Sequence, residues 1–165
     1  MDPMNRRRFL SGFLGLIAAV LITRKGFGKS DDMPGKIEKI MKTKDEWRKL
    51  LTPEQFHVLR DEGTERPFSS PLNENKQKGR YVCAGCELPL FASEMKFDSG
   101  TGWPSFFTSI EGRLETRLDF KLLLPRTEYH CARCGGHHGH VFKDGPPPTG
   151  QRWCNNGVAL KFIPL

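Results

Sequence analysis

The chain has 165 residues, of which 37% are hydrophobic, and its 17 glycines and 12 prolines favour one domain of strands and turns over a bundle of long helices. The formal net charge is +7, but without residues 1–28 the counts fall from 26 basic and 19 acidic residues to 21 and 18. The remaining chain has no dense run of Lys and Arg with interleaved aromatic residues, which argues against a nucleic-acid partner.

Residues 1–28 resemble an export signal. Three arginines, Arg6 to Arg8, precede an apolar stretch from Phe9 to Ile22, which is short for a membrane span and typical of the hydrophobic region of a signal peptide. Paired arginines shortly before Phe-Leu are similar to a twin-arginine signal. Residues 26–28, Gly-Phe-Gly, form a candidate cleavage site. We therefore expect export to the bacterial periplasm or an equivalent compartment, with an uncleaved membrane anchor as the alternative.

Two short helices are predicted near the start of the main domain, which we place at residues 37–165 after a polar linker at 29–36. A Thr-x-x-Glu capping box predicts a helix over residues 43–51. A Thr-Pro-x-Gln pattern predicts a second helix over residues 52–61. The polar, proline-containing residues 64–78 predict an extended surface loop.

Short apolar runs separated by turn residues follow from Gly79 onward and predict a small antiparallel β fold. The candidate strands are residues 80–83, 90–92, 106–107, 114–118, 122–124, 128–131, 139–142, 153–155 and 159–163. The fold class is therefore mainly β, with the two short helices at its N-terminal side.

Four of the five cysteines form two C-x-x-C pairs, Cys83 with Cys86 and Cys131 with Cys134. Two sulfurs from one tight turn can bind the same ion, and four thiolates complete a tetrahedral zinc site that has no open position for chemistry. Two disulfides or two redox pairs are the alternatives, but redox pairs usually open a helix, whereas Gly- and Pro-containing segments follow here. We therefore predict one structural Zn²⁺.

Cys154 is the fifth cysteine and a candidate nucleophile. Arg152 precedes it by two positions, so in a strand both side chains lie on one face, where the guanidinium charge would lower the pKa of the thiol. His137 and His140 can converge if the backbone bends, and either could donate a proton to a reacting oxygen. Trp103 follows a Gly-rich turn and could hold a methyl or thioether group. An inert buried cysteine and a core tryptophan are the simpler alternatives.

These motifs together resemble the B-type methionine sulfoxide reductases, which act on the R epimer of methionine sulfoxide. The resemblance covers roughly Ile37 to the C-terminus. The matching segments are FDSGTGWPSF (97–106), CARCGGHHGHVF (131–142), DGPPPTG (144–150) and RWCNNGVAL (152–160). The family implies a fold of two antiparallel β-sheets, a zinc ion on the two cysteine pairs, and oxidised methionine-containing proteins, with free methionine sulfoxide as a further substrate.

The resemblance also implies roles for single residues. Cys154 falls on the position of the nucleophile, and Trp103 on that of the tryptophan that binds the substrate methyl group. The other active-site positions fall on Arg152, His137, His140 and Asn156. His138 occupies a position that is often apolar in the family, so we do not include it in the site.

Thr101 stands where many family members have a resolving cysteine. Because zinc would hold the other four thiols, no internal partner remains for Cys154 after it has become a sulfenic acid. We therefore expect regeneration by an external thiol, either a thioredoxin-like protein or a small thiol. Residues 118–125 also depart from the family's usual sequence, so we expect an altered loop there, and Gly157 replaces a common serine.

A zinc-ribbon-like module that is exported to bind a protein partner is the alternative function. Such a module would explain the cysteine pairs but gives no reason for Arg152 and Cys154 beside a pair of histidines. Titration with one thiol reagent at neutral pH would discriminate the two, because rapid alkylation of a single cysteine favours the enzyme.

Overall fold

The computed structural model describes residues 37–122 and 124–165. The predicted export signal at 1–28 and linker at 29–36 lie outside the described residues and stay predictions. Among the residues that the structure describes, no helix has both the length and the apolar character that a membrane crossing needs.

Both predicted helices are present and begin where their capping boxes place them. Helix α1 spans Lys44–Leu50 and α2 spans Pro53–Asp61, and in each the N-terminal threonine side chain accepts a hydrogen bond from the backbone N–H three residues later. Helix α2 ends at Glu62, which adopts a left-handed conformation with φ of 56°. The helices bury apolar side chains against the rest of the domain: Trp47, Phe56, Val58 and Leu59.

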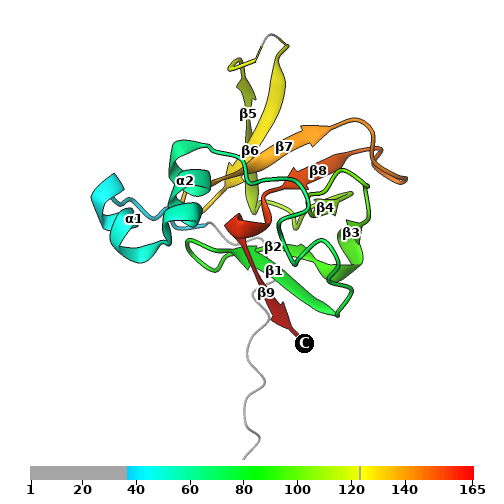
Figure 1. The fold of residues 1–165 in the computed structure, drawn as a ribbon, viewed down its shortest axis with the longest axis horizontal. Coiled ribbons are helices and arrows are strands. Elements are labelled where there is room, and N and C mark those ends of the chain that lie inside the picture. Colours follow the sequence, from blue (N-terminus) through cyan, green and yellow to red (C-terminus); the bar gives the residue numbers. More distant parts are fainter. Residues whose placement is uncertain (1–36, 123) are drawn as a thin grey trace, which may run out of the picture. The chain divides into compact units, whose positions relative to one another are not determined.

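Two antiparallel sheets make up the rest of the domain, which confirms the predicted fold class (Figure 1). The smaller sheet has the order β2 (Pro89–Ala92), β1 (Gly79–Cys83) and β9 (Leu160–Pro164). The larger sheet has the order β3 (Lys96–Phe97), β4 (Ser105–Phe106), β8 (Arg152–Asn155), β7 (His137–Phe142), β6 (Arg126–Cys131) and β5 (Leu114–Asp119). Two 3₁₀ turns, η1 (Ser93–Met95) and η2 (Gly157–Ala159), complete the described elements.

The strand predicted at residues 122–124 is wrong. Leu122 and Leu124 lie in bends of the connection between β5 and β6, and their exposed fractions are 58% and 75%. The leucine run has the composition of a buried strand, but no neighbouring strand pairs with its described residues. Sequence reasoning also missed β3, which has only two residues and therefore shows no alternation.

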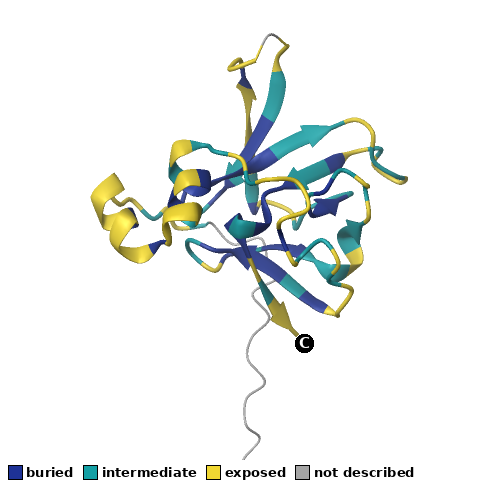
Figure 2. Cartoon of the chain, viewed as in Figure 1, coloured by how far each residue is buried: buried dark blue, intermediate teal, exposed yellow. Residues whose placement is uncertain are grey.

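Aromatic side chains contribute much of the core between the two sheets. The strand segments coloured dark blue in Figure 2 are buried. Phe91 from the small sheet stacks on Phe106 from the large sheet, with ring centroids 4.0 Å apart. Tyr129 contacts Trp153 edge-on at 5.0 Å. Because side chains alternate along a strand, the neighbours of these core residues point to the opposite face of the large sheet. That opposite face carries the candidate site.

Candidate active site

A row of five directly paired residues crosses the polar face of the large sheet. Arg117 on β5 pairs with Glu128 on β6, Glu128 with His140 on β7, His140 with Cys154 on β8, and Cys154 with Ser105 on β4. Paired residues in an antiparallel sheet point to the same side, with Cβ atoms about 5 Å apart. The sheet register therefore brings a thiol, an imidazole and a carboxylate side by side.

A β-bulge explains how His137 and His140 share this face although they are three positions apart. Between β6 and β7, Tyr129 pairs with Gly139 and His130 with His137, which leaves His138 as the extra residue of the bulge. The His137 and His140 ring centroids are 5.6 Å apart. The bend that the sequence required is therefore present.

Gly139 allows β7 and β8 to approach closely beside the bulge. A Cβ atom built on Gly139 would lie 1.9 Å from the carbonyl oxygen of Cys154. Only glycine fits there without displacing the strand that carries the thiol.

Cys154 lines a cavity of ≈ 140 Å³. The other lining residues are Thr64, Trp103, Arg126, Gly139, His140, Phe142, Asn155 and Asn156. Trp103 and Phe142 contribute aromatic side chains, while His140 and Asn156 contribute polar ones. The structure thus brings four of the predicted site residues (Cys154, His140, Trp103 and Asn156) to one small cavity.

The expected low pKa of Cys154 is not what the structure gives. Burial raises the pKa of the Cys154 thiol, and the nearby Arg152 guanidinium and Thr101 hydroxyl only partly offset this effect. Arg152 lies on the same strand face as expected, but it also binds Asp144 through two hydrogen bonds of 2.9 and 3.0 Å. The carboxylate of Asp144 partly neutralises the charge of Arg152, which reduces the effect of Arg152 on the pKa of the thiol.

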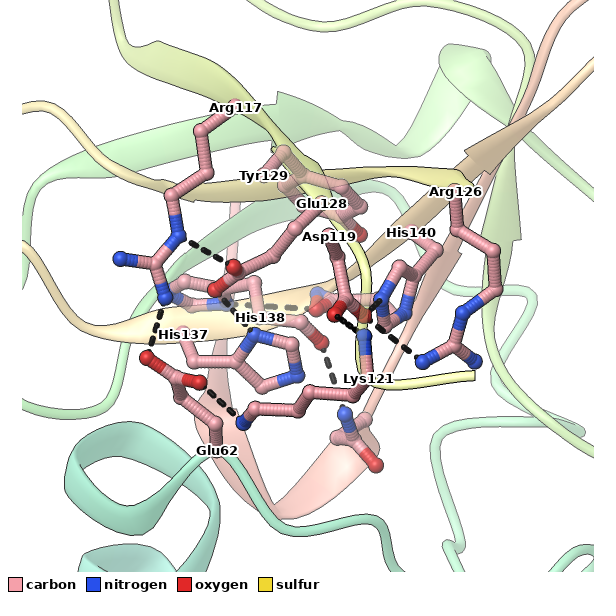
Figure 3. A network of polar contacts seen from close by, with 12 residues as sticks. Glu62, Arg117, Asp119, Lys121, Arg126, Glu128, Tyr129, His137, His138 and His140 are labelled. Carbon is pink, nitrogen blue, oxygen red and sulfur yellow. Dashed lines mark hydrogen bonds and ion pairs between the residues drawn. The ribbon is translucent and has the colours of Figure 1, made fainter. Parts of the chain in front are cut away.

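Each of the two histidines binds its own carboxylate (Figure 3). Nδ1 of His137 lies 2.7 Å from an oxygen of Glu128, and Nε2 of His140 lies 2.7 Å from Oδ2 of Asp119. The two histidines are not equivalent, because His137 lines a separate cavity of ≈ 200 Å³ that does not include Cys154. Burial also lowers the pKa of His137. His140 is therefore the histidine at the thiol.

Glu65 is a contributor that sequence reasoning missed. Its backbone carbonyl accepts a hydrogen bond from Nε1 of Trp103 (3.2 Å), and its backbone N–H donates to Oδ1 of Asn156 (3.0 Å). Its carboxylate accepts hydrogen bonds from the backbone N–H groups of Gly157 and Val158. One loop residue thus fixes Trp103 and Asn156, which lie far apart in the sequence.

Asp119, Glu128 and Asp144 were missed as well. Asp144 and Glu128 lie in or beside recognised motifs, so their positions could have drawn attention. Asp119 meets His140 only because β5, β6 and β7 pair in that order. A single sequence carries no signal for such pairing.

His138 points the other way, into the core. It is fully buried, stacks on Tyr129 with ring centroids 6.3 Å apart, and places Nδ1 3.2 Å from Oδ1 of Asn155. Its exclusion from the predicted site agrees with this position.

The four paired cysteines form a cluster that could hold one metal ion. Their sulfur atoms all lie within 4.8 Å of one another, with 3.6 Å between Cys83 and Cys134 and 3.5 Å between Cys86 and Cys131. Four sulfurs at about 2.3 Å from a tetrahedral zinc ion would be about 3.8 Å apart, whereas a disulfide needs about 2.05 Å. The donor set and spacing therefore fit zinc, and the four cysteines are free thiols.

The cluster joins the two sheets. One cysteine pair lies at the turn between β1 and β2 of the small sheet, and the other lies at the turn between β6 and β7 of the large sheet. Cys154 is not part of it. The four paired cysteines are thus separate in space from Cys154, as the sequence predicts.

The fold and site define a class of protein: a two-sheet β domain with a four-cysteine cluster and a separate thiol site served by a carboxylate-bound histidine. Residues 51–164 match the SelR domain, and the chain belongs to that family. Similar proteins include one from Methanosarcina barkeri, 55% identical over 124 residues (74% of this chain, 87% of the relative). Others come from Agrobacterium fabrum, 52% identical over 128 residues (77% and 95%), and Pseudomonas putida, 55% identical over 130 residues (78% and 97%). All three are named "Peptide methionine sulfoxide reductase MsrB".

Proposed function

We propose that this protein reduces the R epimer of methionine sulfoxide, in oxidised proteins and as the free amino acid, with Cys154 as the nucleophile. The observation that carries the proposal is the direct pairing of Cys154 with His140 across β7 and β8, at a cavity that also contains Trp103. The names of the similar proteins support the same reaction. A non-catalytic binding module would need neither the pairing nor the cavity.

The first step, in which methionine sulfoxide is reduced and Cys154 is oxidised, needs no reagent other than the protein and the substrate. The Cys154 sulfur bonds to the sulfoxide sulfur, His140 gives a proton to the sulfoxide oxygen, and the thiol proton replaces the one that His140 has given. The protonated oxygen then moves to the Cys154 sulfur: a Cys154 S–O bond forms while the substrate S–O bond and the bond between the two sulfurs break, so that methionine leaves reduced by two electrons. The oxygen and one proton remain on Cys154 as a sulfenic acid. A Cys154 thiol with a raised pKa fits this order of steps, because it is still protonated when the substrate binds and can return a proton to His140.

The remaining site residues bind and orient the reactants. Trp103 and Phe142 form apolar walls for the substrate methyl group, which would orient one epimer with its oxygen toward His140. Arg152 stabilises negative charge that develops on the Cys154 sulfur. Asn156 holds the turn after Cys154 through a hydrogen bond of 2.9 Å from Nδ2 to the carbonyl oxygen of His138.

Cys83, Cys86, Cys131 and Cys134 would hold one Zn²⁺ as a structural ion. The ion would supply a cross-link between the sheets, and its four-thiolate shell leaves no position for substrate. Loss of zinc should therefore affect stability before it affects the chemistry of Cys154.

Regeneration of the sulfenic acid is assigned to an external thiol, because Thr101 cannot form a disulfide. A thioredoxin-like protein or a small thiol would attack Cys154 through a mixed disulfide. One equivalent of substrate added to the reduced protein without reductant should give one added oxygen on the Cys154 peptide. A stoichiometric intramolecular disulfide at Cys154 would contradict this step.

Residues 1–28 are proposed to direct export by the twin-arginine route, before a linker at 29–36 and the reductase domain at 37–165. The compartment would be the bacterial periplasm or its equivalent, with membrane attachment only if the signal is not cleaved. Replacing Arg6 and Arg7 by Lys should block export, because lysine lacks the planar fork of arginine. Normal export of that variant in cell fractions would show that another route is used.

An assay on separated R and S sulfoxides, with the parent and with Cys154→Ser, tests the proposed reaction. The parent should reduce only the R epimer, and the variant should be inactive while it keeps its zinc and its melting temperature. Substantial turnover by Cys154→Ser would disprove the assignment of the nucleophile. A parent that reduces neither epimer would favour the binding module.

A further inference from the structure

Asp119 at the end of β5 is held from three sides on the polar face of the large sheet (Figure 3). Its Oδ2 accepts hydrogen bonds from Nε2 of His140 and Nη2 of Arg126, each at 2.7 Å. Its Oδ1 accepts one from the backbone N–H of Lys121 at 2.9 Å. The residue is only 8% exposed. A buried carboxylate with this many donors has a defined position and a defined charge.

The charge of Asp119 determines which nitrogen of His140 carries a proton. The Lys121 backbone N–H, His140 and Arg126 keep the pKa of Asp119 well below its usual range. An ionised carboxylate only accepts hydrogen bonds, so Nε2 of His140 must be the donor. Nδ1 is then the nitrogen that remains to exchange protons with a reacting group.

We infer that Asp119 is a positioning residue for His140: it fixes the ring orientation and the Nε2–H tautomer, and it stabilises the imidazolium that serves as the proton donor. The inference rests on the proposed function, in which His140 protonates the sulfoxide oxygen. Asp119 itself does not line the Cys154 cavity and acts only through the histidine.

The other charged groups around His140 do not replace this carboxylate. Glu128 lies opposite His140 on β6, but its carboxylate binds His137 and Arg117. On the other side, Cys154 on β8 is the reacting thiol, and Arg152 binds Asp144. Arg126 lines the Cys154 cavity with His140 and forms an ion pair with Asp119, so it supplies a positive charge there and cannot replace the carboxylate. In the described part of the chain, Asp119 is thus the carboxylate that bonds directly to the His140 ring.

The hairpin that carries Asp119 is anchored to helix α2. Glu62, which follows α2, forms ion pairs with Arg117 and Lys121, on either side of Asp119 in the sequence. These contacts let Asp119 stay in place when its own carboxylate is changed. A substitution that keeps its shape can therefore test its charge separately from the fold.

Asp119→Asn is the decisive variant, because asparagine has nearly the same shape and no charge. We expect kcat to fall by about tenfold or more, the order of a weakened general acid, with KM changed less than about twofold. The alkaline limb of the kcat profile should move to lower pH, because an imidazolium without its carboxylate loses its proton more readily. The melting temperature should fall, because Arg126 loses its buried charged partner, and kinetics are therefore compared at a temperature where both proteins are folded.

Glu115→Gln provides the matched control. Glu115 lies on the same strand and the same face as Asp119, and it forms ion pairs with Lys39 and His130 away from the Cys154 cavity. This variant should keep kcat and the pH profile of the parent. If Asp119→Asn and Glu115→Gln lose activity equally, or if the pH profile of Asp119→Asn does not move, Asp119 is only structural and the inference fails.

Nitrogen NMR of the imidazole rings in the reduced protein without substrate gives a readout that does not depend on turnover. The parent should show His140 as the Nε2–H tautomer, and Asp119→Asn should show a mixture of the two tautomers. Unchanged His140 signals would overturn the positioning role. A parent that lacks reductase activity but shows the expected signals would instead disprove the proposed function and leave the positioning intact.

Discussion

His138 shows how one residue can make stability depend on pH without taking part in the reaction. Burial lowers its pKa to about 4, from an unfolded value near 6.5. A histidine with a depressed folded pKa contributes stability above pH 6.5, and this contribution is lost as the pH falls from 6.5 towards 4, because the unfolded chain binds the proton first. The burial of His137 acts in the same direction.

We therefore predict that His138→Leu flattens the fall in unfolding free energy between pH 6.5 and pH 4. The difference in the pH-dependent loss of unfolding free energy between parent and variant should reach about 3 kcal/mol at pH 4. Denaturant unfolding at a series of pH values measures it. An unchanged slope in His138→Leu would contradict the prediction.

Trp103 gives a second prediction at the level of single residues. Trp103→Ala should raise the apparent KM for methyl sulfoxides by about tenfold, in line with the loss of about 1.4 kcal/mol of contact with the substrate. Alkylation of Cys154 should proceed at nearly the parent rate, because the tryptophan donates its hydrogen bond to Glu65 rather than to the thiol. Steady-state kinetics and thiol labelling would separate these two effects. An unchanged KM in a folded variant would reject the aromatic wall.

The secondary-structure elements differ in how far the sequence predicts them. Both helices were predicted because a capping box lies within four residues, as Thr43 with Glu46 does. The run at 122–124 was predicted wrongly, because its composition was read without knowing that no strand would pair with it. The contact between Asp119 and His140 could not be predicted from the sequence, because it depends on the pairing of β5, β6 and β7. Local signals therefore predicted the elements, whereas long-range pairing built the site.

The caps allow a test at the level of one element. Thr52→Ala removes the side chain that accepts a hydrogen bond from the Gln55 backbone N–H at the start of α2. We predict a loss of about 1 kcal/mol of unfolding free energy. Activity should persist, because no residue of α2 lines the Cys154 cavity. Urea denaturation measures the loss, and Thr52→Ser, which keeps the hydroxyl, should retain most of the stability.

At the scale of the whole molecule, the four-cysteine cluster links the small sheet to the large one, and in the proposed function it holds a structural zinc ion. Cys134→Ser should lose zinc and lower the melting temperature sharply, because apparent binding free energies at such sites are about 10 kcal/mol or more, comparable with the stability of a domain. Metal analysis and thermal unfolding of the same sample test this. Cys154→Ser is the matched control and should keep both. A metal-free Cys134→Ser that melts like the parent would rule out a structural role.

The bulge at His138 has a consequence for how such sites can be found. On a regular strand, even spacings share a face and odd spacings do not, so two histidines three apart would be split between core and solvent. The extra residue changes this parity, and His137 joins His140 on the polar face while His138 enters the core. A search that insists on strict alternation would therefore reject this arrangement. A search that allows one extra residue in a strand, next to a glycine such as Gly139, would place His137 and His140 on the same face from the sequence alone.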